Sequence, residues 1–369
     1  MYRVSISKAT RGVRAALVEA LALIGGLESS VTPGDRVLIK PNLNGEEGFT
    51  APDLTIALVA LLRDLGVREV AIAESTFGTA ATTDRLFHAT GYADLAKELG
   101  VELINLNRSV PVEVAVPQPL VTERLRIACE VLEADRLINL PNMKVHYATG
   151  MSVALKNMKG VLVGPEKRRC HEIGLDKAIA DLNQVVPPAL NVVDAISCME
   201  RMGPRGGDQV RLDLVMAGAN AAAVDWVAAQ VMGYRPEEIA HLRHFVEQTG
   251  MNTEDVVVSG ESVESVAYPF KKVVVAQIVP ACFTVRDSDA CSACMNAFLL
   301  SCQLLGQTPE RSIDVYLGTS TAKAEHGNAS SIAFGNCCVG ALSADIRIRG
   351  CPPYPFALEE ALRKAGWTA

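Results

Sequence analysis

The chain has 369 residues, of which 49% are hydrophobic and 21% are charged, and its formal net charge at pH 7 is -7. This length allows one large core or two domains, and the composition is that of a globular protein in water. An acidic chain has no global field that would attract nucleic acid or an anionic membrane, so neither is an expected partner.

Neither a targeting segment nor a membrane span is predicted. The first residues, MYRVSISKATRGVRAAL, lack the uninterrupted apolar stretch of a signal peptide. Apolar runs such as VVVAQIVPACFTV are shorter than the roughly 18 residues of a spanning helix, and this one contains a proline. We therefore expect a cytoplasmic protein, in which the ten cysteines are not expected to form disulfides.

The first 270 residues alternate between strand-like and helix-like segments. Short apolar segments rich in β-branched residues predict strands at 2–6, 35–43, 67–75, 101–106, 135–142, 189–196 and 211–218. Apolar residues at helical spacing predict helices at 13–24, 54–65, 92–99, 151–158, 175–182, 221–232 and 236–249. This alternation is typical of an α/β fold with a mostly parallel sheet and helices on both faces.

A domain boundary is predicted near residues 266–273, VAYPFKKV. Six of the ten cysteines lie beyond Asp289, so the chain changes character after this segment. We expect an α/β domain over residues 1–270 and a smaller, cysteine-rich α/β domain over residues 271–369.

Polar clusters stand where several predicted strands end. They are Lys40 to Asn42, Glu74 to Thr76, Asn142 to His146, and Asp194. Ligands of open parallel sheets bind beyond the carboxyl ends of the strands. We therefore expect these clusters to line one shared pocket.

Cations are concentrated between residues 144 and 159. If 151–158 is a helix, Lys156 and Lys159 share one face at i, i+3 spacing, and the first amides of the helix are available to an anion. With Lys40 and Lys144 they predict a carboxylate or phosphate site, and the alternative is a solvated basic helix.

Two histidines are candidates for acid–base chemistry, because imidazole titrates near neutrality. Asp194 and Glu200 could orient His146 and His171, or form a cation site with them. The predicted catalytic residues are Lys144, His146 and His171, and the predicted substrate-binding residues are Lys40, Asn42, Lys156, Asn157 and Asp194. The loop MGPRGG lacks P-loop spacing, and no dinucleotide fingerprint is present, so neither a Walker-type ATP site nor an NAD site is predicted.

Four cysteines have the arrangement of a metal-ligand set. Two residues separate Cys291 from Cys294, 42 residues separate Cys294 from Cys337, and a further 13 precede Cys351. Four thiolates are what a [4Fe–4S] cluster needs, and proline after a ligand cysteine recurs in cluster sites. The alternatives are structural zinc, which also takes four cysteines, and no metal. Whether Cys338 replaces Cys337 stays open, and the predicted core cysteines are Cys129, Cys170, Cys198, Cys282 and Cys302.

Two short segments resemble cluster motifs of larger enzymes. RGCPPYPFALEEAL resembles the last cluster-ligand motif in the small subunits of complex I and nickel–iron hydrogenases, where GCPPxP precedes a helix. FGNCCVG resembles their GxCA segment, with Cys338 in place of the alanine. The resemblance implies a ligand geometry, not a shared activity.

From about Val37 to its end the chain resembles the DUF362 family, poorly characterised prokaryotic proteins often tied to iron–sulfur centres. The motifs are IKPNLN (39–44), NLPNMKVHYATGMSVALKNMKG (139–160), HEIGLDKAIADLN (171–183), VVDAISCMERMGPRGG (192–207) and VDWVAAQVMGY (224–234). Many relatives carry an inserted CxxCxxC segment, which this chain lacks, so one cluster is implied and not two. The family name supplies no reaction.

The favoured hypothesis is an iron–sulfur oxidoreductase. One [4Fe–4S] cluster, beside a basic pocket, passes electrons from a donor such as a ferredoxin to an anionic small molecule or cofactor. Lys40, Lys144 and Lys156 clamp this molecule, and His146 handles a proton. A variant uses the cluster as a Lewis acid without redox chemistry. The alternatives are a non-enzymatic electron-transfer or accessory cluster protein and a zinc-stabilised binding module, and a homodimer is left open.

Overall fold

The computed structural model describes residues 1–319, 330–339 and 343–368. The chain divides into two compact units, Met1–Lys272 and Val273–Ala369. Within the described residues, no helix combines the length and the apolar character needed to cross a membrane.

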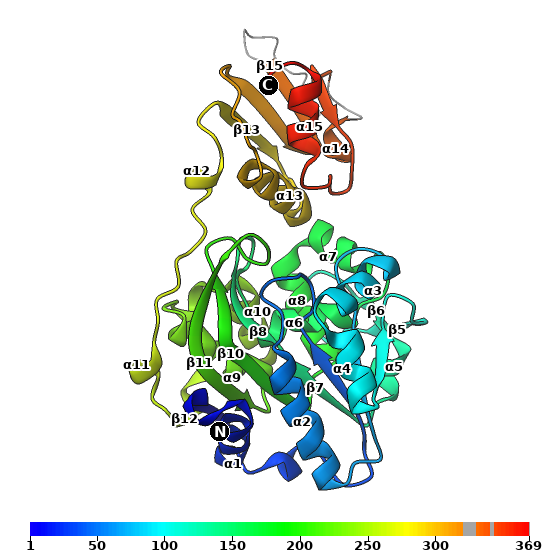
Figure 1. Cartoon of the computed structure of the whole chain (residues 1–369), viewed down its shortest axis with the longest axis vertical. Coiled ribbons are helices and arrows are strands. Elements are labelled where there is room, and N and C mark those ends of the chain that lie inside the picture. Colours follow the sequence, from blue (N-terminus) through cyan, green and yellow to red (C-terminus); the bar gives the residue numbers. More distant parts are fainter. Residues whose placement is uncertain (320–329, 340–342, 369) are drawn as a thin grey trace. The chain divides into compact units, whose positions relative to one another are not determined.

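A large mixed sheet forms the centre of the first unit (Figure 1). The strand order is β12 (Val256–Gly260), β1 (Tyr2–Lys8), β11 (Asp208–Gly218), β10 (Leu190–Glu200), β7 (Arg136–Leu140), β2 (Arg36–Pro41), β3 (Glu69–Glu74) and β4 (Glu102–Asn105). From β10 to β4 all neighbours are parallel, whereas β11 is antiparallel to both β1 and β10. The predicted mostly parallel α/β sheet is therefore confirmed.

Helices cover both faces of this sheet. In β2, Val37 and Ile39 belong to one apolar core and Leu38 to the other, because successive side chains of a strand point to opposite faces. The first core includes residues of α1 (Val13–Leu23), α2 (Pro52–Leu65) and α4 (Tyr92–Leu99). The second includes residues of the 3-10 helix η3 (Met158–Val161), α7 (Glu166–Ile173) and α8 (Leu175–Val185). Burial on both faces is typical of parallel strands.

The other elements of the first unit are shorter or lie at its periphery. The hairpin β5–β6 was not predicted, because β5 is largely exposed and lacks an apolar pattern. The shorter and peripheral elements of the first unit are α3 (Ala80–Ala89), β5 (Pro111–Ala115), β6 (Arg124–Ala128), α5 (Cys129–Glu133), α6 (Ala154–Asn157), α9 (Ala221–Val231), α10 (Ala240–Thr249), α11 (Val263–Val266), η1 (Ala9–Arg11), η2 (Leu27–Ser29), η4 (Pro236–Glu238) and η5 (Thr253–Asp255).

The segment expected to be the basic helix has a different structure. Asn142–His146 is not a loop beyond β7 but a further strand, β8, which pairs with β10. Pro141, which has no N–H to donate to a ladder, separates β7 from β8. Gly150–Ser152 forms β9, antiparallel to β8, so the predicted helix 151–158 is wrong in its first half. Only the four residues of α6 are α-helical, and η3 follows directly.

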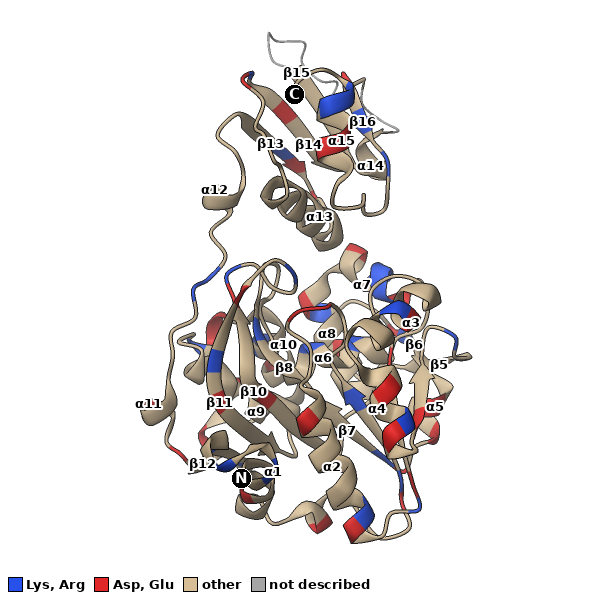
Figure 2. Ribbon diagram, viewed as in Figure 1, with Lys and Arg blue, Asp and Glu red and all other residues tan. Residues whose placement is uncertain are grey.

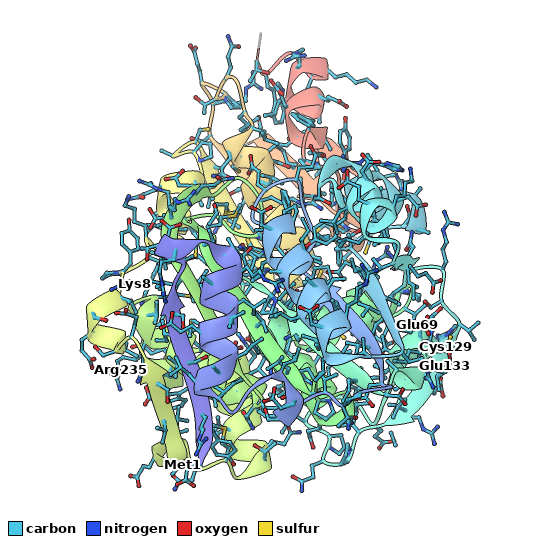
Figure 3. All side chains as sticks on the ribbon, turned by 60° about the horizontal axis from the view of Figure 1, so that its bottom comes forward. Met1, Lys8, Glu69, Cys129, Glu133 and Arg235 are labelled. Atoms are coloured by element: carbon cyan, nitrogen blue, oxygen red, sulfur yellow. The ribbon has the colours of Figure 1, made fainter. Side chains whose placement is uncertain are left out.

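One edge of the first unit carries ion pairs around a partly exposed cysteine. Arg36 pairs with Glu69 at 3.3 Å and with Glu133 at 3.7 Å. Figure 3 shows Glu69, Cys129 and Glu133 together along this edge. Of the predicted core cysteines, Cys170, Cys198 and Cys302 are buried, whereas Cys129 and Cys282 are only partly buried.

A parallel four-stranded sheet forms the second unit, in the order β13 (Phe283–Ser288), β14 (Ile313–Gly318), β15 (Ser330–Phe334) and β16 (Ile346–Ile348). The described helices are α12 (Val275–Ile278), α13 (Ser292–Gln303), α14 (Asn336–Val339) and α15 (Ala357–Lys364). The core centres on Phe298, which packs against Phe283 and Phe334 at ring-centroid distances of 6.3 and 5.6 Å.

Candidate functional site

A buried ion pair lies at the carboxyl ends of β2 and β3. Lys40 is fully buried, its Nζ lies 3.0 Å from Glu74 Oε2, and it also donates to the Pro41 carbonyl at 2.9 Å. Gly160 packs directly against the pair, and a Cβ there would stand 1.9 Å from Glu74 Oε1. Lys40 is therefore enclosed by protein atoms and paired within the chain, and its role as a substrate clamp stays a prediction.

A continuous chain of amide hydrogen bonds crosses the sheet beside this pair. Lys144 Nζ donates to Asn42 Oδ1, and the Nδ2 groups of Asn42 and Asn157 donate to Asn157 and Asn139, each over 2.8 Å. Asn139 then donates to Asn191 over 2.9 Å. Lys144 also donates to the Gly48 carbonyl at 2.5 Å. Asn42 and Asn157, predicted to bind substrate, are thus links between elements.

The N-terminus of α6 is occupied by a carboxylate of the protein itself. Asp225, on α9, accepts from the backbone N–H groups of Ala154 at 2.6 Å and Leu155 at 3.0 Å. The expectation that these amides bind an anion is therefore wrong. Burial raises the pKa of Asp225 to about 7, although the two amide hydrogen bonds oppose the shift.

Lys156 extends from the helix that Asp225 fixes. Its side chain is partly buried, and within the described residues no hydrogen bond or ion pair is made to its amine. Burial lowers its pKa well below the ordinary value, and the neighbouring charges of Lys159 and Lys144 lower it further.

Lys159, on η3, contacts the histidine of α7. Its Nζ lies 2.6 Å from His171 Nε2, and it stands 6.0 Å from the centroid of the Phe77 ring. An ammonium donating to Nε2 leaves the imidazole proton on Nδ1. Burial lowers the pKa of Lys159 to about 8, and burial and then Lys159 hold the pKa of His171 well below its usual range.

His146 is also kept neutral. It is buried, its Nδ1 accepts from the backbone N–H of Ala148 at 3.1 Å, and its ring packs on Tyr147 with centroids 4.7 Å apart. Since Nδ1 accepts, the neutral ring carries its proton on Nε2. Burial, followed by the charge of Lys156, lowers its pKa well below the usual value.

Two further cations were not predicted for the site. Lys167 lies in the charged run EKRR of α7, where Figure 2 shows both signs of charge, so it resembled a solvated residue. It is nevertheless buried and donates to Asn107 Oδ1 at 2.6 Å and to the Thr76 carbonyl at 3.3 Å. Burial lowers its pKa to about 7. Arg205, in the MGPRGG loop, has its pKa lowered by burial in the same way.

The cluster carries more positive than negative charge. Its buried or partly buried cations are Lys40, Lys144, Lys156, Lys159, Lys167 and Arg205. The carboxylates that act on them are already engaged: Glu46 with Arg85, Glu74 with Lys40, Asp176 with His241, and Asp194 with backbone amides. We call the five cations other than Lys40 the lysine–arginine cluster. Burial is the main cause of the lowered pKa values of these five cations, and neighbouring positive charges add to it for Lys144, Lys156, Lys167 and Arg205.

Asp194 joins two backbone segments through hydrogen bonds. It accepts from the N–H of Ala51, just before α2, at 2.7 Å and from that of Ile196 at 3.0 Å. These two bonds anchor the start of α2, and the predicted role of Asp194 in substrate binding stays a prediction. Glu200 pairs with Lys271 at 3.0 Å. Among the described residues, no three His, Cys, Asp or Glu side chains are placed to hold a single metal ion, which includes the set His146, His171, Asp194 and Glu200.

Four thiols come together in the second unit. Cys291 precedes α13 and is hydrogen-bonded to Cys294, in the first turn of that helix. This bond raises the pKa of Cys294 far above its usual value, and burial and then the thiols of Cys291, Cys351 and Cys337 add to the shift. Cys291, Cys337 and Cys351 therefore all lie within electrostatic range of Cys294.

Two backbone segments bring Cys337 and Cys351 together. Asn336 donates its N–H to the Gly350 carbonyl, and the Gly350 N–H donates to Asn336 Oδ1, both over 2.9 Å. A Cβ on Gly335 would stand only 3.2 Å from Cys294 Sγ, and the residue has a φ of 101°, so glycine suits this position.

The neighbouring cysteines Cys337 and Cys338 differ in orientation. Cys338 is fully buried and its thiol donates to the Gly318 carbonyl at 2.9 Å. Burial raises its pKa to about 11. Cys337 is exposed, and its thiol contributes to the raised pKa of Cys294. Of this pair, Cys337 is thus the one that is free of core packing.

Comparison with known proteins identifies the family of the chain and a curated relative. Residues 37–230, about half of the chain, match the family model described as "Domain of unknown function (DUF362)". A thylakoid-associated protein of Synechocystis sp. is 29% identical over 236 residues, which cover 61% of this chain and 71% of that protein.

Two solved structures align over most of the chain. The lactate racemase apoprotein of Thermoanaerobacterium thermosaccharolyticum is 14% identical with a TM-score of 0.43, covering 86% of this chain and 68% of that one. A protein of Thermotoga maritima is 11% identical with a TM-score of 0.39, covering 83% of this chain and 70% of that one.

Replacing Asp194 by alanine is expected to destabilise the first unit. The change removes a buried acceptor of two backbone hydrogen bonds, and bonds to charged groups contribute about 1.5–3 kcal/mol each. Urea denaturation of Asp194→Ala should show this loss, whereas exposed Asp53→Ala, in the first turn of α2, should lose well under half as much. Unchanged stability of Asp194→Ala would contradict the anchoring role.

The free energy of unfolding is expected to rise between pH 7 and pH 9. Lys144 and Lys167 have folded pKa values of about 7 against an ordinary 10.5, so in this window the unfolded chain binds more protons. Each lysine adds at most about 1.4 kcal/mol per pH unit. The groups that act on Lys144 are Glu74, Lys40, Asp194 and Arg205.

Urea titrations at pH 7, 8 and 9 measure this slope. The variant Lys144→Met should have a shallower slope than the wild type, because one depressed lysine is removed. Lys97→Met, at an exposed position on α4, should keep the wild-type slope. Equal slopes for all three proteins would show that Lys144 titrates normally.

Proposed function

Since the chain belongs to the DUF362 family, whose description assigns no reaction, we propose a function from its own residues: an iron–sulfur oxidoreductase that acts on a small anion. The second unit holds one [4Fe–4S] cluster, and the lysine–arginine cluster of the first unit binds the anion. The observation that carries this proposal is the convergence of four thiols from three separate segments.

The donor set fits an iron–sulfur cluster better than a single metal ion. Cys291, Cys337 and Cys351 each contribute to the raised pKa of Cys294, yet no three donors among the described residues have single-ion spacing. In a cubane each thiolate binds a different iron, so the ligands stand farther apart than around one zinc ion. The bound cluster would supply single electrons.

Ligand binding by the first unit is supported by its uncompensated charge. Buried charges in proteins are normally paired, but among the described residues the carboxylates that act on the lysine–arginine cluster are each bonded to another group. A small anion carrying two or more charges would stabilise the protonated lysines and restore their pKa values. The lysine–arginine cluster favours an enzyme over a simple electron carrier, because an electron carrier needs no anion-binding site.

The residues of the first unit have separate roles in this proposal. Lys159 and Lys167 supply positive charge, because their pKa values of about 8 and 7 lie close to cellular pH and rise when an anion binds. His146, neutral with its proton on Nε2, donates a hydrogen bond or a proton to the substrate. His171 keeps Lys159 in place. The electron donor is proposed to be a ferredoxin-type protein.

Anaerobic purification should yield about four irons and four sulfides per chain. The broad visible absorbance should bleach with dithionite, and iron, sulfide and zinc analysis gives the stoichiometry. Cys337→Ser should lose most of the cluster, whereas the matched neighbour Cys338→Ser should keep it, because that thiol donates to a backbone carbonyl instead. Zinc in place of iron, or no metal, would overturn the proposal. Iron that dithionite does not reduce would favour the Lewis-acid alternative.

Anion binding is expected to raise the melting temperature of the protein. Citrate or inorganic phosphate at about 100 times its Kd should add roughly 2.7 kcal/mol of stability. The shift should shrink in Lys159→Met and Lys167→Met and persist in Lys97→Met, which is measured by thermal unfolding at constant ionic strength. Equal shifts in all four proteins would identify a general salt effect and exclude a site.

A further inference from the structure

Lys156 differs from every other lysine of the cluster. Lys144 donates to Asn42 and Gly48, Lys159 contacts His171, and Lys167 donates to Asn107. For Lys156 the described part of the chain offers the amine no hydrogen-bond acceptor and no carboxylate within ion-pair distance. The residue as a whole is only partly buried, unlike Lys144 and Lys167, which are buried.

The backbone that carries Lys156 is held on both sides. Asp225 accepts from the two amides that precede it in α6, and the next residue, Asn157, is fixed in the amide chain between Asn42 and Asn139. The amine is thus presented from a rigid support, which is what a reacting group requires.

The surroundings of the amine disfavour its charged form. Burial acts first, and the charges of Lys159, Lys144 and Lys40 act in the same direction, whereas Asp176 alone opposes them. Asp176 is itself paired with His241 at 3.3 Å. A lysine that is desolvated and placed beside other cations is the arrangement in which an amine becomes a nucleophile at neutral pH.

We propose that the Nζ of Lys156 forms an imine with an anionic carbonyl compound of the 2-oxo acid class. This inference rests on the proposed anion-binding role of the first unit and narrows its substrate class. The amine attacks the carbonyl carbon, the carbon–oxygen double bond is replaced by a carbon–nitrogen double bond, and the oxygen leaves as water with the two amine protons. No oxidant or reductant is consumed.

The neighbours of Lys156 fit the two needs of this step. The carboxylate of a 2-oxo acid requires fixed positive charge, which Lys159 supplies beside Lys156. The departing hydroxyl requires a proton donor, and His146, which interacts electrostatically with Lys156, carries a proton on Nε2. An imine is neutral or singly charged, so its formation also avoids the cost of protonating an amine among cations.

Reductive trapping tests the inference directly. The full-length protein is incubated with pyruvate or 2-oxoglutarate, sodium borohydride is added, and the adduct is located by peptide mass spectrometry. We expect a borohydride-dependent adduct at Lys156 at least tenfold above that at exposed Lys97. Mapping in the wild-type protein makes the result independent of whether a variant folds. No adduct, or equal labelling of both lysines, would overturn the inference.

Variants and a non-carbonyl anion separate this inference from the proposed function. Lys156→Arg should lose the adduct but keep stabilisation by malonate, which has carboxylates and no ketone. Thermal stabilisation by malonate without any adduct from a 2-oxo acid would refute the imine alone. Absence of both would refute the anion site as well.

Discussion

The site in the first unit is organised around the sealed ion pair of Lys40 and Glu74. The pair joins the ends of β2 and β3, and Glu74 also accepts from the backbone of Leu43. Breaking a buried pair by removing one partner typically costs about 3–5 kcal/mol. The pair engages Glu74, a buried carboxylate that also acts on Lys144 and Lys167, so its charge is shared with Lys40. Excess positive charge in the cluster is thus a consequence of how the sheet ends are joined.

The sequence predicted the architecture well because burial leaves a local signature. Strand β2 and helix α4 have their apolar residues at the spacing of their own secondary structure, and α4 was predicted at its observed bounds. The spacing of apolar residues did not predict the structure of residues 150–161. Strand β9 is defined by its pairing with β8, and α6 begins where Asp225, 71 residues from Ala154, accepts its first amide.

The candidate site was predicted by residue type and less well by role. Lys144, His146, Lys156 and Lys159 do belong to one cluster, but the partner of each is set by tertiary contacts. Lys40 and Glu74 are 34 residues apart, so the sequence could not reveal that one neutralises the other. Lys167 was missed because a charged run usually marks a solvated helix. The cysteine spacing predicts four ligands, and three of these cysteines lie near enough to Cys294 to raise its pKa; their role as cluster ligands stays a prediction.

The amide chain from Lys144 to Asn191 has a fixed direction. At one end an ammonium can only donate, and at the other Asn191 donates to the Gly218 carbonyl, which can only accept. Every carboxamide between them must therefore face the same way, and none can rotate alone without setting two donors or two acceptors against each other. A single polarity therefore runs through side chains from four elements and one loop, and the ammonium at one end and the carbonyl at the other require the same direction.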